Sequence, residues 1–114
     1  TLGTPHSGSK LAALAPGRLA RHLLPCSTIF SLLRQAPPLE GLPCAAFVSP
    51  EDDAVLPTSH LLPPESWRLR ITRPVSHFSM LLCPDIADAV LAEVNEMAGV
   101  ASEPPYVAVR QVLP

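Results

Sequence analysis

Hydrophobic and polar positions along the chain first indicate strands. The run LPCAAFVS at residues 42–49 is short and almost wholly apolar, which is typical of a strand covered on both faces in a parallel sheet. Residues 67–73 differ, because Trp67, Leu69 and Ile71 alternate with polar side chains. This alternation predicts a strand with one solvated face, near the edge of a sheet.

A third strand is expected to end at the N-terminus of the sequence. Leu2 is followed at once by Gly3-Thr4-Pro5, a combination that breaks a strand into a turn. Most of that strand would precede Thr1. The pattern therefore predicts about three parallel strands.

Helical signals lie between and after these strands. Residues 10–15 fit a short helical turn that stops at Pro16-Gly17. Residues 28–35 fit a helix with Ser27 as its N-cap. Near the C-terminus, CPDIADAVLAEVNEM places Pro84 at a favourable first helical position, with aspartates in the first turns. Strands and helices in this order predict an α/β class with flanking helices and right-handed crossovers.

Composition excludes several classes of function. Hydrophobic residues make up 47% of the 114 residues and charged ones 16%, as expected of a folded domain rather than a disordered chain. A net charge of −2 and few aromatics argue against nucleic acid as a partner. No apolar run approaches the roughly 18 residues of a transmembrane segment. The compartment is not indicated.

Metal and cofactor sites are not expected either. The four histidines show no metal-binding spacing, and no motif for a cofactor is present. Cys26, Cys44 and Cys83 form no C-x-x-C pair, and we expect them to be buried apolar residues, with one disulfide left open.

Two loops that follow predicted strands carry ionisable side chains. SPEDDAVLPTSH (49–60) follows the apolar strand and offers carboxylates, whereas PVSHFSMLLCP (74–84) follows the alternating strand and offers a histidine. Ligands of parallel sheets bind at the carboxyl ends of the strands, so these loops are the expected site. Taken singly, an acidic turn or a lone histidine is more often structural.

Four segments in this order resemble the C-terminal half of an α/β-hydrolase lipase or esterase. They are LGTPHSGS, LLPCSTIFSLL, FVSPEDDAVLPTSHLL and VSHFSMLLCPDIADAVLAEV, and together they cover residues 1–98, with residues 99–114 left as a tail of uncertain structure. The order acid then histidine is that of the family, whose nucleophilic serine precedes both. The resemblance implies the C-terminal part of an α/β-hydrolase sheet, incomplete without the upstream half.

The family pattern assigns roles to individual residues. Asp53 matches the acid of a D-G-x-V-P-like loop, although Ala54 stands where glycine is usual, and His77 matches the catalytic base. Asp52 and Glu51 are the alternative acids, because a shift of one residue in the loop would exchange them. The acid would fix the tautomer of the base, which takes the proton of the nucleophile.

The remaining histidines are not expected to be catalytic. The resemblance implies that His6, with Thr4 and Ser7 beside it, hydrogen-bonds and shapes the loop next to the active site. His22 and His60 are expected to be surface residues.

The sequence contains no G-x-S-x-G, the motif that would supply the nucleophile. The resemblance therefore implies the C-terminal fragment of a carboxylic-ester hydrolase acting on small-molecule or lipid esters, inactive by itself and missing the N-terminal half of its domain. A non-catalytic remnant that acts as a binding module is the alternative. Ser7-Gly8-Ser9-Lys10 matches S-x-x-K without its partner motifs, and Thr1 is a possible N-terminal nucleophile; both are weaker hypotheses.

Overall fold

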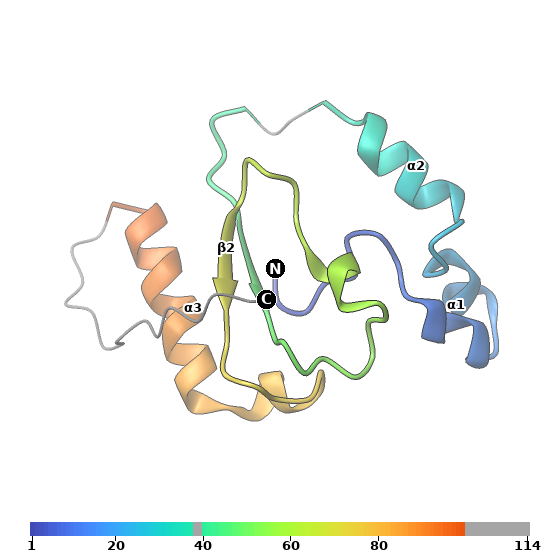
Figure 1. The fold of residues 1–114 in the computed structure, drawn as a ribbon. Coiled ribbons are helices and arrows are strands. Elements are labelled where there is room, and N and C mark those ends of the chain that lie inside the picture. Colours follow the sequence, from blue (N-terminus) through green and yellow to red (C-terminus); the bar gives the residue numbers. More distant parts are fainter. Residues whose placement is uncertain (38–39, 100–114) are drawn as a thin grey trace. The chain divides into compact units, whose positions relative to one another are not determined.

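A computed structural model describes residues 1–37 and 40–99 of the chain. The chain divides into two compact units, Thr1–Leu82 and Cys83–Pro114, the second described as far as Gly99. In chain order, the elements are η1 (Lys10–Leu14), α1 (Arg18–His22), α2 (Thr28–Gln35), β1 (Ala45–Val48), η2 (Thr58–Leu61), β2 (Arg68–Ile71), η3 (Ser79–Leu82) and α3 (Pro84–Met97), where η denotes a 3-10 turn (Figure 1). This mixture confirms the α/β class.

The first unit is built around a small parallel sheet. β1 pairs in parallel with β2, in a register that places Ala45 opposite Arg68 and Val48 opposite Ile71. On the other side of β1, Leu2 forms a parallel bridge with Phe47, supported by hydrogen bonds from Phe47 N to Thr1 O and from Gly3 N to Phe47 O. The three expected strand segments are thus adjacent and parallel, with β1 in the centre.

Burial follows the sequence pattern for β1 and departs from it for β2. Ala46, Phe47 and Val48 are buried, and Val48 packs with Val55 and Leu61 in the core. In β2, Leu69 and Ile71 are 40% and 42% exposed, so the expected apolar face exists but is open to solvent. Both strands are shorter than expected.

The predicted helices are present. Ser27 caps α2 by accepting a hydrogen bond from Ile29 N, as expected. The turn predicted at residues 10–15 is η1, which is capped by Ser9. In the second unit, α3 begins at Pro84 and carries Asp85 in its first turn, which favours the helix dipole. The predicted tail lies outside the described residues, apart from Gly99.

Candidate functional site

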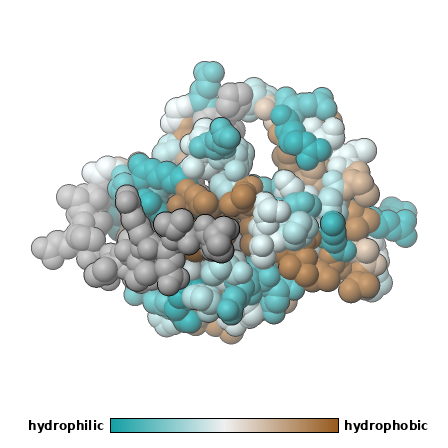
Figure 2. Space-filling view, in the orientation of Figure 1, coloured by the Kyte–Doolittle hydropathy of each residue, from teal (hydrophilic) through white to brown (hydrophobic). Residues whose placement is uncertain are grey.

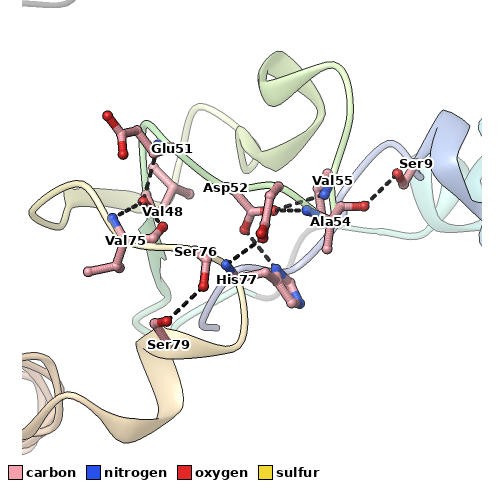
Figure 3. A network of polar contacts seen from close by, with 12 residues as sticks. Ser9, Val48, Glu51, Asp52, Ala54, Val55, Val75, Ser76, His77 and Ser79 are labelled. Atoms are coloured by element: carbon pink, nitrogen blue, oxygen red, sulfur yellow. Dashed lines mark hydrogen bonds and ion pairs between the residues drawn. The ribbon is translucent and has the colours of Figure 1, made fainter.

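The site lies in two loops that leave the same end of the sheet. Because β1 and β2 are parallel, the loop after Val48 and the loop after Ile71 both start at the carboxyl edge. The first loop carries Asp52, and the second carries His77. The two side chains meet, with Nδ1 of His77 2.7 Å from Oδ2 of Asp52 (Figure 3).

Asp52 is held in one orientation by its own loop. Its side chain is fully buried, and Oδ1 accepts hydrogen bonds from Ala54 N at 3.0 Å and Val55 N at 2.8 Å. Oδ2 is thereby left for the imidazole (Figure 3). Hydrogen bonds from two amides and a ring N–H compensate the burial of the carboxylate.

The hydrogen bond to the His77 ring that was expected of Asp53 is made instead by its neighbour Asp52, the alternative residue. Asp53 is exposed, and its Oδ1 accepts from the backbone N–H of His77 at 2.9 Å instead of from the ring. Glu51 is also exposed and does not contact the ring. Asp52 orients the imidazole, whereas Asp53 anchors the backbone that carries it.

The imidazole of His77 keeps one nitrogen accessible. A neutral ring that donates from Nδ1 to Asp52 has its lone pair on Nε2. Among residues 1–37 and 40–99, no group hydrogen-bonds this nitrogen, and the side chain is 27% exposed. The ring also contacts Phe78 edge-on, with centroids 5.5 Å apart. His77 can thus accept a proton from a group that approaches from outside.

Gly3 closes one side of the imidazole. Its φ is +55°, and a Cβ at this position would lie 3.1 Å from Cε1 and 3.2 Å from Nδ1 of His77, and 2.7 Å from Cε of Met80. Only glycine lets the backbone approach the ring this closely. The expected strand end at Leu2-Gly3 therefore contributes directly to the site.

Ser49 links the loop of residues 49–60, called the acid loop below, to the loop of residues 74–84, called the histidine loop. Its hydroxyl donates to Val75 O at 2.6 Å and accepts from Val75 N at 3.0 Å and from Glu51 N at 3.2 Å. The residue is buried. One side chain thus fixes the spacing of the segments that carry Asp52 and His77.

Ser9 fastens the N-terminal loop to the acid loop. The buried hydroxyl donates to Ala54 O at 2.8 Å (Figure 3). It also accepts from Leu56 N at 3.1 Å and from Leu11 N at 3.2 Å. In addition, Lys10 N donates to Leu56 O at 2.8 Å. Sequence reasoning missed this residue, because a serine beside a helical turn indicates a cap and not a contact 45 positions away.

His60 is a structural residue of the same region, and its assignment to the plain surface was wrong. Its Nδ1 hydrogen-bonds Gly8 O at 2.9 Å, and its carbonyl accepts from Ser7 N at 3.2 Å. The side chain is partly buried. His22, by contrast, is exposed, as predicted.

Thr4, His6 and Ser7, which were expected to shape the loop next to the site, make different kinds of contact. Ser7 joins the loop of His60 through its backbone, and Thr4 O accepts from His6 N within the turn. The ring of His6 packs edge-on against Trp67, and Nε2 lies 3.3 Å from Thr1 Oγ1. Burial, with a smaller contribution from the N-terminal ammonium, lowers the pKa of His6 below its ordinary value.

The structure assigns no metal or disulfide to these residues. No cluster of three or more His, Cys, Asp or Glu side chains capable of holding a metal occurs among the described residues. None of the three cysteines forms a disulfide within the described residues, and the expectation that they are buried was wrong, since Cys26 is exposed and Cys44 and Cys83 are partly exposed. Within the described ranges, no helix is both long and apolar enough to cross a membrane.

The geometry can orient and activate a base. A buried carboxylate fixes the tautomer of an imidazole whose second nitrogen is accessible, which is the arrangement that a hydroxyl nucleophile requires. No family model matches the chain, and comparisons with curated proteins and with solved structures gave no match.

Proposed function

We propose that the chain is the C-terminal part of a serine hydrolase that cleaves carboxylic esters, with His77 as general base and Asp52 as its orienting acid. The observation that carries this proposal is the 2.7 Å contact between His77 Nδ1 and the buried Oδ2 of Asp52. The nucleophile and the oxyanion hole would belong to sequence outside these 114 residues.

In this mechanism each residue has a separate task. Nε2 of His77 takes the proton of the serine hydroxyl as it attacks the ester carbonyl, and later returns it to the leaving alcohol. Asp52 holds the ring in the Nδ1–H tautomer and stabilises the imidazolium. Asp53 and Gly3 determine where the ring lies, because one binds its backbone and the other leaves room for it.

The pairing of His77 with Asp52 can be tested in the 114-residue chain itself, by determining which ring nitrogen of His77 carries the proton. We expect ¹⁵N chemical shifts of the neutral ring to report Nδ1–H. In Asp52→Asn, the oxygen can still accept from Ala54 and Val55, but the amide nitrogen donates toward the ring, so that the proton moves to Nε2. Asp53→Asn is the matched control and should retain Nδ1–H. A ring that changes tautomer in Asp53→Asn and not in Asp52→Asn would contradict the assignment.

Ester hydrolysis tests the function. The chain alone should not hydrolyse 4-nitrophenyl butyrate faster than free imidazole does, because it lacks a nucleophile and an oxyanion hole. In a longer protein that includes an upstream G-x-S-x-G, Asp52→Asn should lower kcat by about 10⁴-fold, whereas Asp53→Asn should lower it far less. Saturable turnover by the 114-residue chain, or full activity in the longer Asp52→Asn protein, would overturn the proposal.

A further inference from the structure

The first 39 residues carry positive charge only. Lys10, Arg18, Arg21 and Arg34 are the four cations of this segment, whereas all ten Asp and Glu residues lie from Glu40 onward. All four cations are exposed, and none of their side chains has a hydrogen-bond or ion-pair partner among residues 1–37 and 40–99. A chain with a net charge of −2 therefore has a strongly basic region.

The same segment exposes large leucines. Leu14, Leu19, Leu32 and Leu33 are 82%, 75%, 66% and 60% exposed, and they lie on or at the ends of η1, α1 and α2. Figure 2 shows hydrophobic side chains gathered over α1 and α2, with hydrophilic ones projecting beside them. We call these four leucines and the four cations together the cationic apolar surface.

The helices themselves place the leucines outward. On α2, Ile29, Leu32 and Leu33 follow helical spacing and form one face, which remains exposed, while Phe30 is buried on another. On α1, Ala20 is buried and Leu19 is exposed. The exposure is therefore a property of whole helix faces, not of single side chains.

This combination of groups selects among possible partners. Nucleic acid would engage the cations but leave the leucines in water, and the only Phe, Trp or Tyr in the segment, Phe30, is buried and cannot stack on bases. A second copy that docked through the same surface would oppose like charges. Helices with leucines on one side and Lys or Arg beside them are typical of segments that lie in the plane of a membrane interface.

We propose that the cationic apolar surface docks the protein on a lipid bilayer that contains anionic phospholipids. The leucines enter the boundary between headgroups and acyl chains, and the cations contact the headgroups. This inference does not rest on the proposed function, because it involves neither Asp52 nor His77.

Vesicle flotation with the full 114-residue chain tests the proposal. Phosphatidylcholine vesicles with and without 30% phosphatidylserine, the probe composition, are compared at ~0.1 M salt, where charges within roughly 10 Å still interact. Each basic residue near an anionic surface raises the partition coefficient about fivefold, so Arg18→Gln/Arg21→Gln should lower it about 25-fold. Leu19→Gln/Leu32→Gln should also abolish flotation. Arg68→Gln/Arg70→Gln, the matched charge control on β2, should reduce it much less.

Several results would overturn the inference. They are equal binding to vesicles without phosphatidylserine, a partition coefficient of Arg18→Gln/Arg21→Gln equal to that of the unchanged chain, and capture of an oligonucleotide in place of vesicles. A dimer that forms without lipid and dissociates on Leu19→Gln/Leu32→Gln would mean that a second copy covers the surface. Because all these side chains are exposed, circular dichroism should show unchanged secondary structure in each variant.

Discussion

At the scale of single residues, Gly3 is a position where the backbone packs tightly against the His77 ring. Its backbone is in the left-handed region, and the space where a Cβ would be is taken by Met80 and the His77 ring. A side chain at position 3 would lower the stability of the fold for two reasons, conformational strain of the backbone and steric overlap with its neighbours. Gly41 has a similar φ of +72° with nothing within 4 Å, so only the first reason applies to it.

We therefore expect Gly3→Ala to lower the free energy of unfolding by about 2–4 kcal/mol, and Gly41→Ala by about 1 kcal/mol. Urea denaturation of both variants measures the difference. Gly3→Ala should also shift the ring resonances of His77, which Gly41→Ala should leave unchanged. Equal stabilities for the two variants would show that the backbone around Gly3 can shift to accommodate a Cβ without loss of stability.

The identity of the acid shows what residue-level sequence reasoning can determine. The pattern located the loop and the histidine that the structure brings together, but Asp52 and Asp53 are adjacent and chemically identical. Which carboxylate turns inward depends on the amides of Ala54 and Val55, both of which reach Asp52. An aspartate that binds amides two and three residues ahead forms a local turn, and this tendency was the available signal for Asp52.

At the scale of elements, the loop between Gly3 and η1 acts through Ser9. The hydroxyl caps η1 and also bonds two backbone groups of the acid loop. Ser27 offers a comparison within the same chain, because it caps α2 through Ile29 N alone. Comparing variants of the two serines therefore distinguishes the contribution of helix capping from the contribution of linking two loops.

We expect Ser9→Ala to lower the free energy of unfolding by about 2–3 kcal/mol, because Ala54 O and Leu56 N lose their partner. Ser27→Ala should cost only about 1 kcal/mol, as is usual for an N-cap. Urea denaturation measures both effects, and amide exchange should become faster at Leu56 in Ser9→Ala alone. Equal effects on stability and exchange would indicate that Ser9 is merely a cap.

The elements were largely predictable, whereas the contacts between loops were not. The hydrophobic pattern identified both strands, and cap and proline signals identified α2 and α3, because these are local features of the sequence. Ser49 and His60 act on backbone groups 26 and 52 positions away, and no local pattern reports such contacts. The predicted strands were too long. At the start of β1, for example, Pro43 lacks the N–H that a paired strand needs.

For the molecule as a whole, β2 is an open edge. Its Leu69 and Ile71 are partly exposed, and no further strand pairs with β2 among the described residues. Exposed edges with apolar side chains recruit other chains. The α/β class was predictable from the order of the elements, but the number of strands in an intact sheet cannot be deduced from three segments.

We expect the 114-residue chain to be marginally stable and to associate as its concentration rises. Ile71→Lys should shift the sedimentation profile toward monomer, because a charged residue at an edge opposes pairing. Leu42→Lys, at an exposed position outside the strands, is the control and should have little effect. A wild-type chain that stays monomeric at every concentration and unfolds in one sharp thermal transition would show that the open edge is harmless.

The hydroxyl of Ser49 also has a dynamic consequence. Since it binds Val75 through both N–H and C=O and binds Glu51 as well, neither loop can swing away without breaking bonds that hold the other. Thermal motion of Asp52 and of His77 is therefore correlated. Fluctuations would carry Asp52 and His77 together as one body, so that their separation stays constant while the position of the pair in space varies.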